Sequence, residues 1–231
     1  MTLEAYLASK GAVAPPGKVN LGLKAARMLI PKQAHLQGRL LATAAVRPMM
    51  VKRIHALTSE GKPIRLHLGA GGRELNGWLN VDLFGSQHKS NLYLDLLKRL
   101  PFDDNTVDAI FHEHTMEHFR YVDALKLARE SYRVLRPGGA LRIGVPDFGA
   151  YATSYAGDGA YIQNARGGRP TPMLALAEVV YEHGHSSIWD RATLEYLLRE
   201  AGFTDFDGAT IGTSFDHPGR RAETIYIEAT K

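Results

Sequence analysis

The sequence predicts an α/β fold built on a mostly parallel, doubly wound sheet. Short apolar runs typical of buried parallel strands recur along the chain, and closely spaced glycines follow the first of them. A helix-patterned stretch separates two of the later runs and ends at a Pro-Gly stop signal. With 231 residues and 45% hydrophobic content, the chain is long enough for one such domain and an appendage.

The first two strands enclose a turn that is typical of a nucleotide-type site. The strand expected over residues 64–68 is followed by Gly69 and Gly71, which lack a Cβ and so let the backbone turn sharply and approach a ligand. A second strand over residues 79–83 would bring Asp82 to the carboxyl end of the sheet, where doubly wound folds hold a ribose diol. A glycine pair alone is weak evidence, because many tight turns bind nothing.

The later elements strengthen this interpretation. A third apolar segment covers residues 92–95, and a polar turn then leads into a strand over residues 109–111. Leu125, Ala128, Tyr132 and Leu135 recur at helical spacing, so we expect a helix after Phe119. It should stop at the segment 136–139, Arg-Pro-Gly-Gly, before a strand over residues 140–145.

In this order the motifs resemble the class I S-adenosylmethionine-dependent methyltransferases. The matching segments are "LHLGAGG", "NVDL", "LDL", "LPFDDNTVDAIFHEHTMEHF" and "VLRPGGALRIGVPD", over about residues 64–148, and later "WDRATLEYLLREAGF" and "AETIYIEAT". The resemblance implies a Rossmann-like, seven-stranded, mostly parallel sheet with an antiparallel last strand and helices on both faces.

The same resemblance implies a site for S-adenosylmethionine. Gly69 to Gly71 would lie against its amino acid moiety, Asp82 would hold the ribose, and Asp95 with Leu96 would contact the adenine. His112 would contact the cofactor through its backbone. The full set of expected cofactor-binding residues is His67, Gly69, Ala70, Gly71, Asp82, Leu83, Asp95, Leu96 and His112.

The chain also departs from the family pattern. His67 stands where the family usually has an acidic residue, and Arg73 stands where it has a third glycine. Only thirteen positions separate Gly69 from Asp82, against about twenty in dinucleotide-binding units. We therefore expect the first crossover helix to be stunted or replaced by a loop. This argues against a nicotinamide cofactor, whose pyrophosphate needs a helix amino terminus.

The segment 112–118, His-Glu-His-Thr-Met-Glu-His, carries the candidate catalytic residues His114, Glu117 and His118. A methyl group on a sulfonium is already activated, so the enzyme mainly has to place the acceptor and take up its proton. His114 is the first candidate base, and in a helix it would share a face with His118. The alternative is that Glu117 and His118 only cap and orient the next helix.

A divalent metal is a second explanation for these side chains. Magnesium prefers oxygen ligands, so Glu113, Glu117 and Asp147 would suit it better than the histidines. No ligand spacing is diagnostic, and the H-E-x-x-H zinc signature is absent.

A long insertion at about residues 146–189 interrupts the family pattern, and we expect it to shape the acceptor pocket. The alternative is an ordinary exposed loop, although long unstructured loops are uncommon without a function. Gly167 and Gly168 could hinge a lid. Aromatic and imidazole side chains with polar rims suit a sugar ring, and the expected substrate residues are Asp147, Tyr151, Tyr155, His183, His185 and Trp189.

Residues 1–60 form a basic, helical amino-terminal extension or cap, and residues 61–231 form the methyltransferase domain. From Lys10 to Ser59 the chain has nine basic residues and no acidic one. This extension could pack as a cap over the pocket, bind an anionic partner, or lie on a membrane surface. Four prolines, at positions 15, 16, 31 and 48, favour short helices and therefore the packing alternative. The basic residues are not interleaved with aromatic groups, so nucleic acid is not expected as a partner.

Composition excludes several classes of protein. Without cysteine there are no disulfides, catalytic thiolates or thiolate zinc sites. No apolar run approaches the length of a membrane span and no signal-like segment opens the chain, so we expect a cytoplasmic location. The oligomeric state stays open, with a homodimer as one alternative.

The variant "LHLGAGG...GWLNVDL" further resembles the saccharide O-methyltransferase type. We therefore expect O-methylation of a hydroxyl on a small polar acceptor such as a saccharide or polysaccharide precursor, and the resemblance extends to mannoside methylation. S-adenosylmethionine would be the methyl donor, with magnesium as an optional cofactor. Two alternatives remain open. One is N- or O-methylation of a non-sugar metabolite, and the other is a non-catalytic cofactor-binding module that docks a partner.

Overall fold

The computed structural model describes residues 2, 4–6, 32–85, 92–206 and 210–231. Six strands form one sheet in the order β3-β2-β1-β4-β5-β6, with β6 antiparallel to its neighbour β5 and the other pairs parallel. The strands are β1 (Arg65–Leu68), β2 (Leu79–Asp82), β3 (Leu92–Tyr93), β4 (Val107–Glu113), β5 (Leu135–Pro146) and β6 (Thr224–Thr230).

The Rossmann-like α/β class and the antiparallel last strand are confirmed, but the described sheet has six strands and not seven. Next to β6, where a further strand would pair, Asp205 forms an isolated bridge to Thr230 in the part of the chain that the structure describes. The chain order reverses between β1 and β4, and open α/β sheets bind ligands at the carboxyl ends of strands at such a point.

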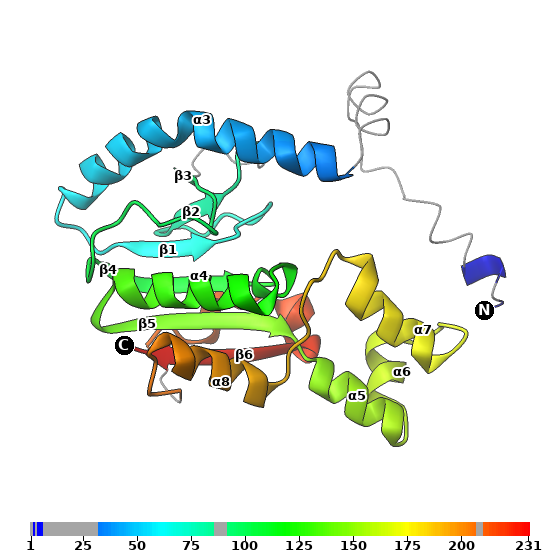
Figure 1. The fold of residues 1–231 in the computed structure, drawn as a ribbon. Helices are drawn as coiled ribbons and strands as arrows, with labels where there is room; N and C mark the ends of the chain where they lie inside the picture. The colour runs from blue at the N-terminus through cyan, green and yellow to red at the C-terminus, as the bar shows by residue number, and fades with distance from the viewer. Residues whose placement is uncertain (1, 3, 7–31, 86–91, 207–209) are drawn as a thin grey trace.

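Helices α4 (Tyr121–Val134) and α8 (Arg191–Ala201) cover one face of the sheet, and α3 (Lys32–Thr58) runs along its β3 edge (Figure 1). The apolar stripes of α4 and α8 recur at helical spacing and join Leu66, Leu68 and Ile110 of the sheet in one buried cluster. Gly202 ends α8 in a left-handed conformation, as expected for a helix stop.

The opposite face is covered differently. Phe111 of β4 packs with Trp78 and Leu75 from the loop after β1, and Phe215 of a later loop packs against Trp78. No helix lies between β1 and β2 in the described chain, which confirms the expected loss of the first crossover helix. Among the described residues, loops stand on this face in place of the expected helices.

The amino-terminal helix corrects one prediction. Pro48 lies inside α3, which is continuous over 27 residues, so this part of the chain is not cut into short helices. Met50 and Ile54 are buried against the sheet, whereas Pro48 itself is exposed. Packing of the buried stripe therefore outweighs the loss of one internal hydrogen bond. Prolines 15, 16 and 31 lie outside the described residues. No described helix is long and apolar enough to cross a membrane.

The insertion folds into helices beyond the carboxyl ends of β4 and β5 (Figure 1). They are α5 (Phe148–Ala156), α6 (Ala160–Arg166) and α7 (Pro172–Ala177), which continues into a π-helical turn at Glu178–Glu182. Tyr151, Ile162, Ala175 and Val179 form their small core. The insertion is thus a packed helical unit and not an extended exposed loop.

Two buried histidines should make the stability of the fold depend on pH. Burial lowers the pKa of His67 to about 4 and that of His112 to about 3. In the unfolded chain the pKa of histidine is about 6.5. Between roughly pH 6.5 and 4 the unfolded state therefore binds protons that the folded state does not. The free energy of unfolding should therefore fall as the pH drops through this window, by up to about 1.4 kcal/mol per pH unit for each histidine.

Urea unfolding at a series of pH values between 7 and 4.5 measures this slope. We expect His67→Gln to reduce the slope of the free energy of unfolding against pH by the contribution of one histidine. His55→Gln, at an exposed position of α3, should leave this slope unchanged. Equal slopes for the wild type and His67→Gln would contradict the prediction.

Candidate active site

A cavity of about 700 Å³ opens where β1 and β4 end. It lies at the switch point of the sheet and is large enough for a nucleotide-sized ligand. We call it the glycine-loop cavity, and it is lined by His67, Gly69, Ala70, Gly71, Gly72, Arg73, Glu113, His114, His217, Pro218 and Arg220.

Gly69 is required by the geometry of the loop. Its φ is +65°, and a Cβ at this position would lie 2.3 Å from Thr115 Oγ1. Both facts exclude other residues, since L side chains avoid this backbone region and the neighbouring strand end leaves no space. Gly71 also has positive φ, and its amide donates to the Asp82 carboxylate at 2.6 Å. The glycine loop that the sequence predicts is therefore a tight cradle with no space for a side chain at Gly69. A hydrogen bond from Gly71 to Asp82 attaches it to the end of β2.

Glu113 organises the opposite wall of the glycine-loop cavity. Its side chain is nearly buried and accepts hydrogen bonds from Arg73 Nη1 at 3.1 Å, from the His217 amide at 2.8 Å and from the Tyr226 hydroxyl. Arg73, which replaces the family's third glycine, thus connects the glycine loop to β4. No local motif indicates this ion pair, because Arg73 and Glu113 lie far apart in the chain.

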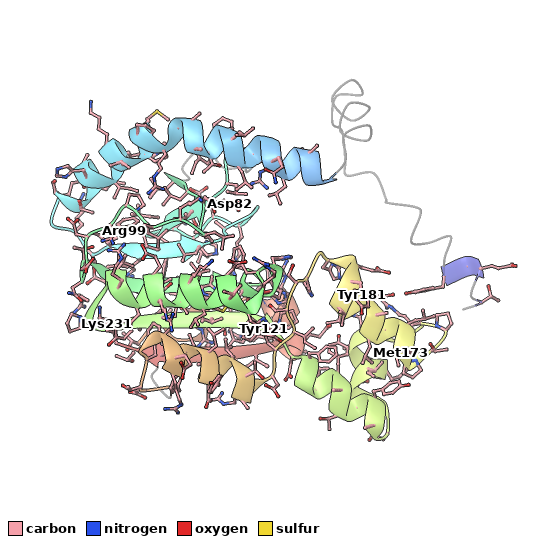
Figure 2. The ribbon with its side chains drawn as sticks, in the orientation of Figure 1. Asp82, Arg99, Tyr121, Met173, Tyr181 and Lys231 are labelled. Carbon is pink, nitrogen blue, oxygen red and sulfur yellow. The ribbon has the colours of Figure 1, made fainter. Side chains whose placement is uncertain are left out.

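Asp82 lies under α3 (Figure 2), and α3 contacts its carboxylate. Arg39 Nη2 donates to Asp82 Oδ1 at 3.1 Å, and the Leu83 amide donates to the same oxygen at 2.6 Å. Asp95 lies in a separate hollow of about 350 Å³ between α3 and β3, where it accepts a hydrogen bond from the Leu97 amide. Gly69 to Gly71 and Asp95 therefore do not line one cavity, although Asp82 contacts the glycine loop directly. Leu96 is buried in the core.

We expect Asp82→Ala to weaken S-adenosylmethionine binding by about tenfold or more, on the scale of roughly 1.5–3 kcal/mol for a hydrogen bond to a charged group. The variant removes the carboxylate that is expected to hold the ribose, and it removes the acceptor of the Gly71 amide hydrogen bond. Isothermal calorimetry measures the change, with the exposed Asp103→Ala as the matched control. Unchanged affinity in Asp82→Ala would refute the ribose assignment.

A second cavity of about 350 Å³ adjoins the first, and His114 and Arg220 line both. We call it the insertion cavity, and it is lined by His114, Glu117, His118, Pro146, Tyr151, Arg166, Val179, His183, His185, Gly219, Arg220 and Glu223. Three of the expected substrate residues, Tyr151, His183 and His185, line it.

The other expected substrate residues lie elsewhere. Asp147 caps α5 by accepting from the Ala150 amide at 2.8 Å, and Tyr155 is exposed on the same helix. Trp189 is buried and packs edge-on against Tyr121, outside this lining. Helix capping and core packing therefore account for Asp147 and Trp189.

His114 has an unusual backbone, with φ of +50°. It precedes a 3-10 turn at Met116–His118, so His114 and His118 do not share a helix face as expected. Its Nε2 lies 2.9 Å from Thr224 Oγ1, and its Nδ1 lies 3.3 Å from Glu117 Oε1. Non-glycine residues held in this region cluster at functional sites, because the surrounding structure must offset the strain.

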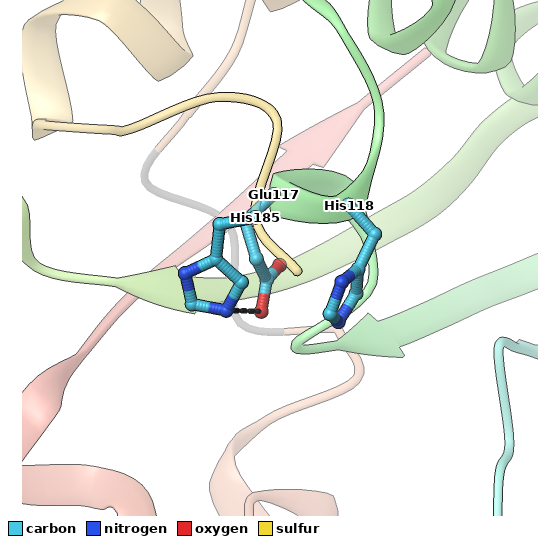
Figure 3. A group of neighbouring side chains, drawn as sticks. All are labelled: Glu117, His118 and His185. Carbon is cyan, nitrogen blue, oxygen red and sulfur yellow. Dashed lines mark ion pairs between the residues drawn. The ribbon is translucent and has the colours of Figure 1, made fainter. Parts of the chain in front are cut away.

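Glu117 is the most unusual group of the segment. Its side chain is 1% exposed, yet neither carboxylate oxygen has a hydrogen-bond partner in the described part of the chain. His118 and His185 stand on either side of it (Figure 3). Burial lowers the pKa of His185, which favours its neutral form.

The oxygen donors proposed for magnesium are not brought together. Glu113 is committed to three donors in the glycine-loop cavity, Asp147 caps α5, and Glu117 faces the insertion cavity. His112 is buried within β4 with its Nδ1 unpaired among the described residues, and it does not line either cavity.

Sequence reasoning missed the charged lining of the insertion cavity. Arg166 pairs with Glu223 at 3.2 Å, and the Tyr151 hydroxyl also donates to Glu223. Glu223 and Arg220 come from the short 3-10 segment Pro218–Glu223 just before β6, where no motif marks them.

A comparison with known protein families finds a match for part of this chain. Residues 83–143 match the family model described as a methyltransferase domain. This match covers about a quarter of the chain and supports the resemblance to S-adenosylmethionine-dependent methyltransferases. The matched segment runs from the end of β2 to β5 and includes Glu113, His114 and Glu117.

Solved structures of methyltransferases are among those to which the chain is similar. A S-adenosylmethionine-dependent methyltransferase from Archaeoglobus fulgidus is 16% identical, with 84% of this chain and 94% of that chain covered and a TM-score of 0.48. Phosphoethanolamine N-methyltransferase 2 from Haemonchus contortus is 15% identical, with 73% and 48% covered and a TM-score of 0.46. A comparison with curated proteins finds no match.

Proposed function

We propose that this methyltransferase transfers a methyl group to a hydroxyl of a small polar acceptor, with saccharides as the first class to test. The observation that carries the proposal is that His114 lines both cavities. The glycine-loop cavity would hold S-adenosylmethionine, and the insertion cavity would hold the acceptor. The base would then lie where the two ligands meet.

The glycine-loop cavity fits the donor on two grounds. Its volume suits a nucleoside of this size, and the Gly69 cradle admits no side chain. When bound, S-adenosylmethionine supplies a methyl group already activated by a positively charged sulfur. The protein must then position the acceptor hydroxyl and take up its proton.

Hydrogen bonding around His114 supports its role in proton uptake. Thr224 Oγ1 donates to the Arg220 carbonyl at 2.7 Å, so His114 Nε2 must donate to Thr224. Nδ1 of a neutral ring then carries a lone pair and lies 3.3 Å from the Glu117 carboxylate. A proton arriving at Nδ1 would be stabilised by that carboxylate.

The insertion cavity suits a polyhydroxylated acceptor. Arg166, Arg220 and Glu223 offer charged donors and acceptors, and Tyr151 and His183 add polar rings. Several hydroxyl groups could hydrogen-bond such a lining at once, whereas an apolar chain would remove its charged groups from water without offering them hydrogen bonds. This charge pattern supports a saccharide over a lipid.

The test is methyl transfer from radiolabelled S-adenosylmethionine to a panel of monosaccharides, nucleotide sugars and oligosaccharides, including mannosides. Small amines of similar size form the second arm. We expect label in hydroxyl acceptors and none in the amines. Transfer to amines alone would overturn O-methylation, and transfer to no member of either arm would favour the non-catalytic alternative.

A further inference from the structure

The cluster of Glu117, His118 and His185 contains one group that the methyl-transfer proposal does not fully explain. One ligand atom from each of the three side chains lies within 4.8 Å of the others. Glu117 Oε1 is 4.0 Å from His185 Nε2, and the two imidazole rings lie edge to face with centroids 5.2 Å apart. In Figure 3 the carboxylate lies between the two rings.

The carboxylate of Glu117 has no compensation among the described residues. Both of its oxygens are buried without a hydrogen-bond partner. Burying an unpaired carboxylate is costly, so such a group is normally satisfied by a cation or by several donors. His114 Nδ1 lies 3.3 Å from Glu117 Oε1, but in the neutral ring this nitrogen carries a lone pair and cannot donate to the carboxylate.

His118 is oriented as metal ligands usually are. Its Nδ1 lies 3.3 Å from the Gly184 carbonyl, which can only accept, so His118 Nδ1 donates and Nε2 keeps its lone pair. Ligating histidines typically donate their second ring N–H to a carbonyl in this way.

The backbone holds the cluster together. The Glu117 carbonyl accepts hydrogen bonds from the amides of Ser186 at 2.7 Å and Ser187 at 3.1 Å. These bonds fix the segment that carries His185 against the turn that carries Glu117 and His118. The three side chains therefore come from two segments that are tied at the site itself.

We propose that Glu117, His118 and His185 bind a divalent first-row transition-metal ion. Two imidazoles and one carboxylate suit zinc, iron(II) or cobalt(II) and are poor ligands for magnesium or calcium. All three residues line the insertion cavity, so open coordination positions would face that space. A role for the ion in orienting an acceptor oxygen rests on the proposed function, whereas ion binding itself does not.

Calorimetric titration of the untagged, chelator-treated full chain with Zn²⁺ tests the site. We expect a single equivalent to bind to the wild type, with Co²⁺ giving a visible absorption band in the same stoichiometry. Glu117→Gln and His185→Ala should each weaken Zn²⁺ binding by about tenfold or more. His183→Ala is the matched control, because His183 is exposed and lies only two residues from His185.

Thermal unfolding and binding of S-adenosylhomocysteine show whether each variant is folded. If Glu117→Gln fails to fold, His118→Ala decides, because His118 is exposed and its loss leaves the buried carboxylate in place. The proposal is overturned if the wild type binds no Zn²⁺. It is also overturned if folded Glu117→Gln, His118→Ala and His185→Ala bind Zn²⁺ as tightly as His183→Ala. Failure of methyl transfer with Zn²⁺ binding intact would count against the proposed function alone.

Discussion

Gly69→Ala is expected to abolish S-adenosylmethionine binding and to lower the free energy of unfolding by about 2–5 kcal/mol. Two independent costs add. The left-handed backbone, with φ of +65°, strains any L side chain, and the new Cβ would lie 2.3 Å from Thr115 Oγ1. The loop must move to relieve the overlap, and this movement deforms the wall of the glycine-loop cavity.

Gly72→Ala is the matched control, because it lies in the same loop and a Cβ there would have no neighbour within 4 Å. We expect it to change stability by less than about 0.5 kcal/mol. Adding Thr115→Ala to Gly69→Ala should recover the part of the loss that comes from the overlap and leave the backbone strain. Chemical denaturation and calorimetry with the cofactor measure both effects. If Gly69→Ala behaves like Gly72→Ala, the loop is not the tight cradle described above.

His114→Asn should reduce turnover by about 10²–10⁴-fold, the range for loss of a positioned acid or base, without loss of cofactor affinity. Asparagine is chosen because it tolerates the left-handed backbone that His114 adopts, so the fold is preserved. The variant removes the ring that lies between Thr224 and Glu117. A fall in activity then reports on chemistry and not on backbone strain.

Steady-state kinetics with the acceptor found in the panel, together with calorimetry for S-adenosylhomocysteine, separates the two contributions. His55→Asn, at an exposed position of α3, is the control for the substitution itself. Turnover within a few-fold of the wild type, at unchanged acceptor affinity, would remove His114 from the proton-transfer role. Loss of cofactor affinity in step with turnover would place His114 in donor binding instead.

The sequence predicted those features that depend on local patterns. Apolar runs marked β1, β2 and β5, and the spacing from Gly69 to Asp82 was too short for a full crossover helix, as the structure confirms. The strand count differs by one, since the described residues next to β6 form a single bridge, from Asp205 to Thr230. The prediction of short helices was also wrong for the segment that forms α3. A single proline is weaker evidence than an apolar stripe that can be buried against the sheet.

The candidate site was predictable only in part, because most of its contacts join distant segments. His114, Glu117 and His118 were marked by their unusual density in one segment. Arg39 on Asp82 and Arg73 on Glu113 depend on how α3 and the glycine loop pack, which no local motif reveals. Trp189 was expected to contact the substrate but is buried in the core. The sequence alone does not distinguish these two roles for an aromatic residue.

A structure of the chain with bound S-adenosylhomocysteine tests the central claim most directly, because that claim concerns where donor and acceptor meet. We expect the ligand in the glycine-loop cavity, with its sulfur beside His114 and directed toward the insertion cavity. A ligand seated instead in the hollow between α3 and β3, or with its sulfur remote from His114, would contradict the account.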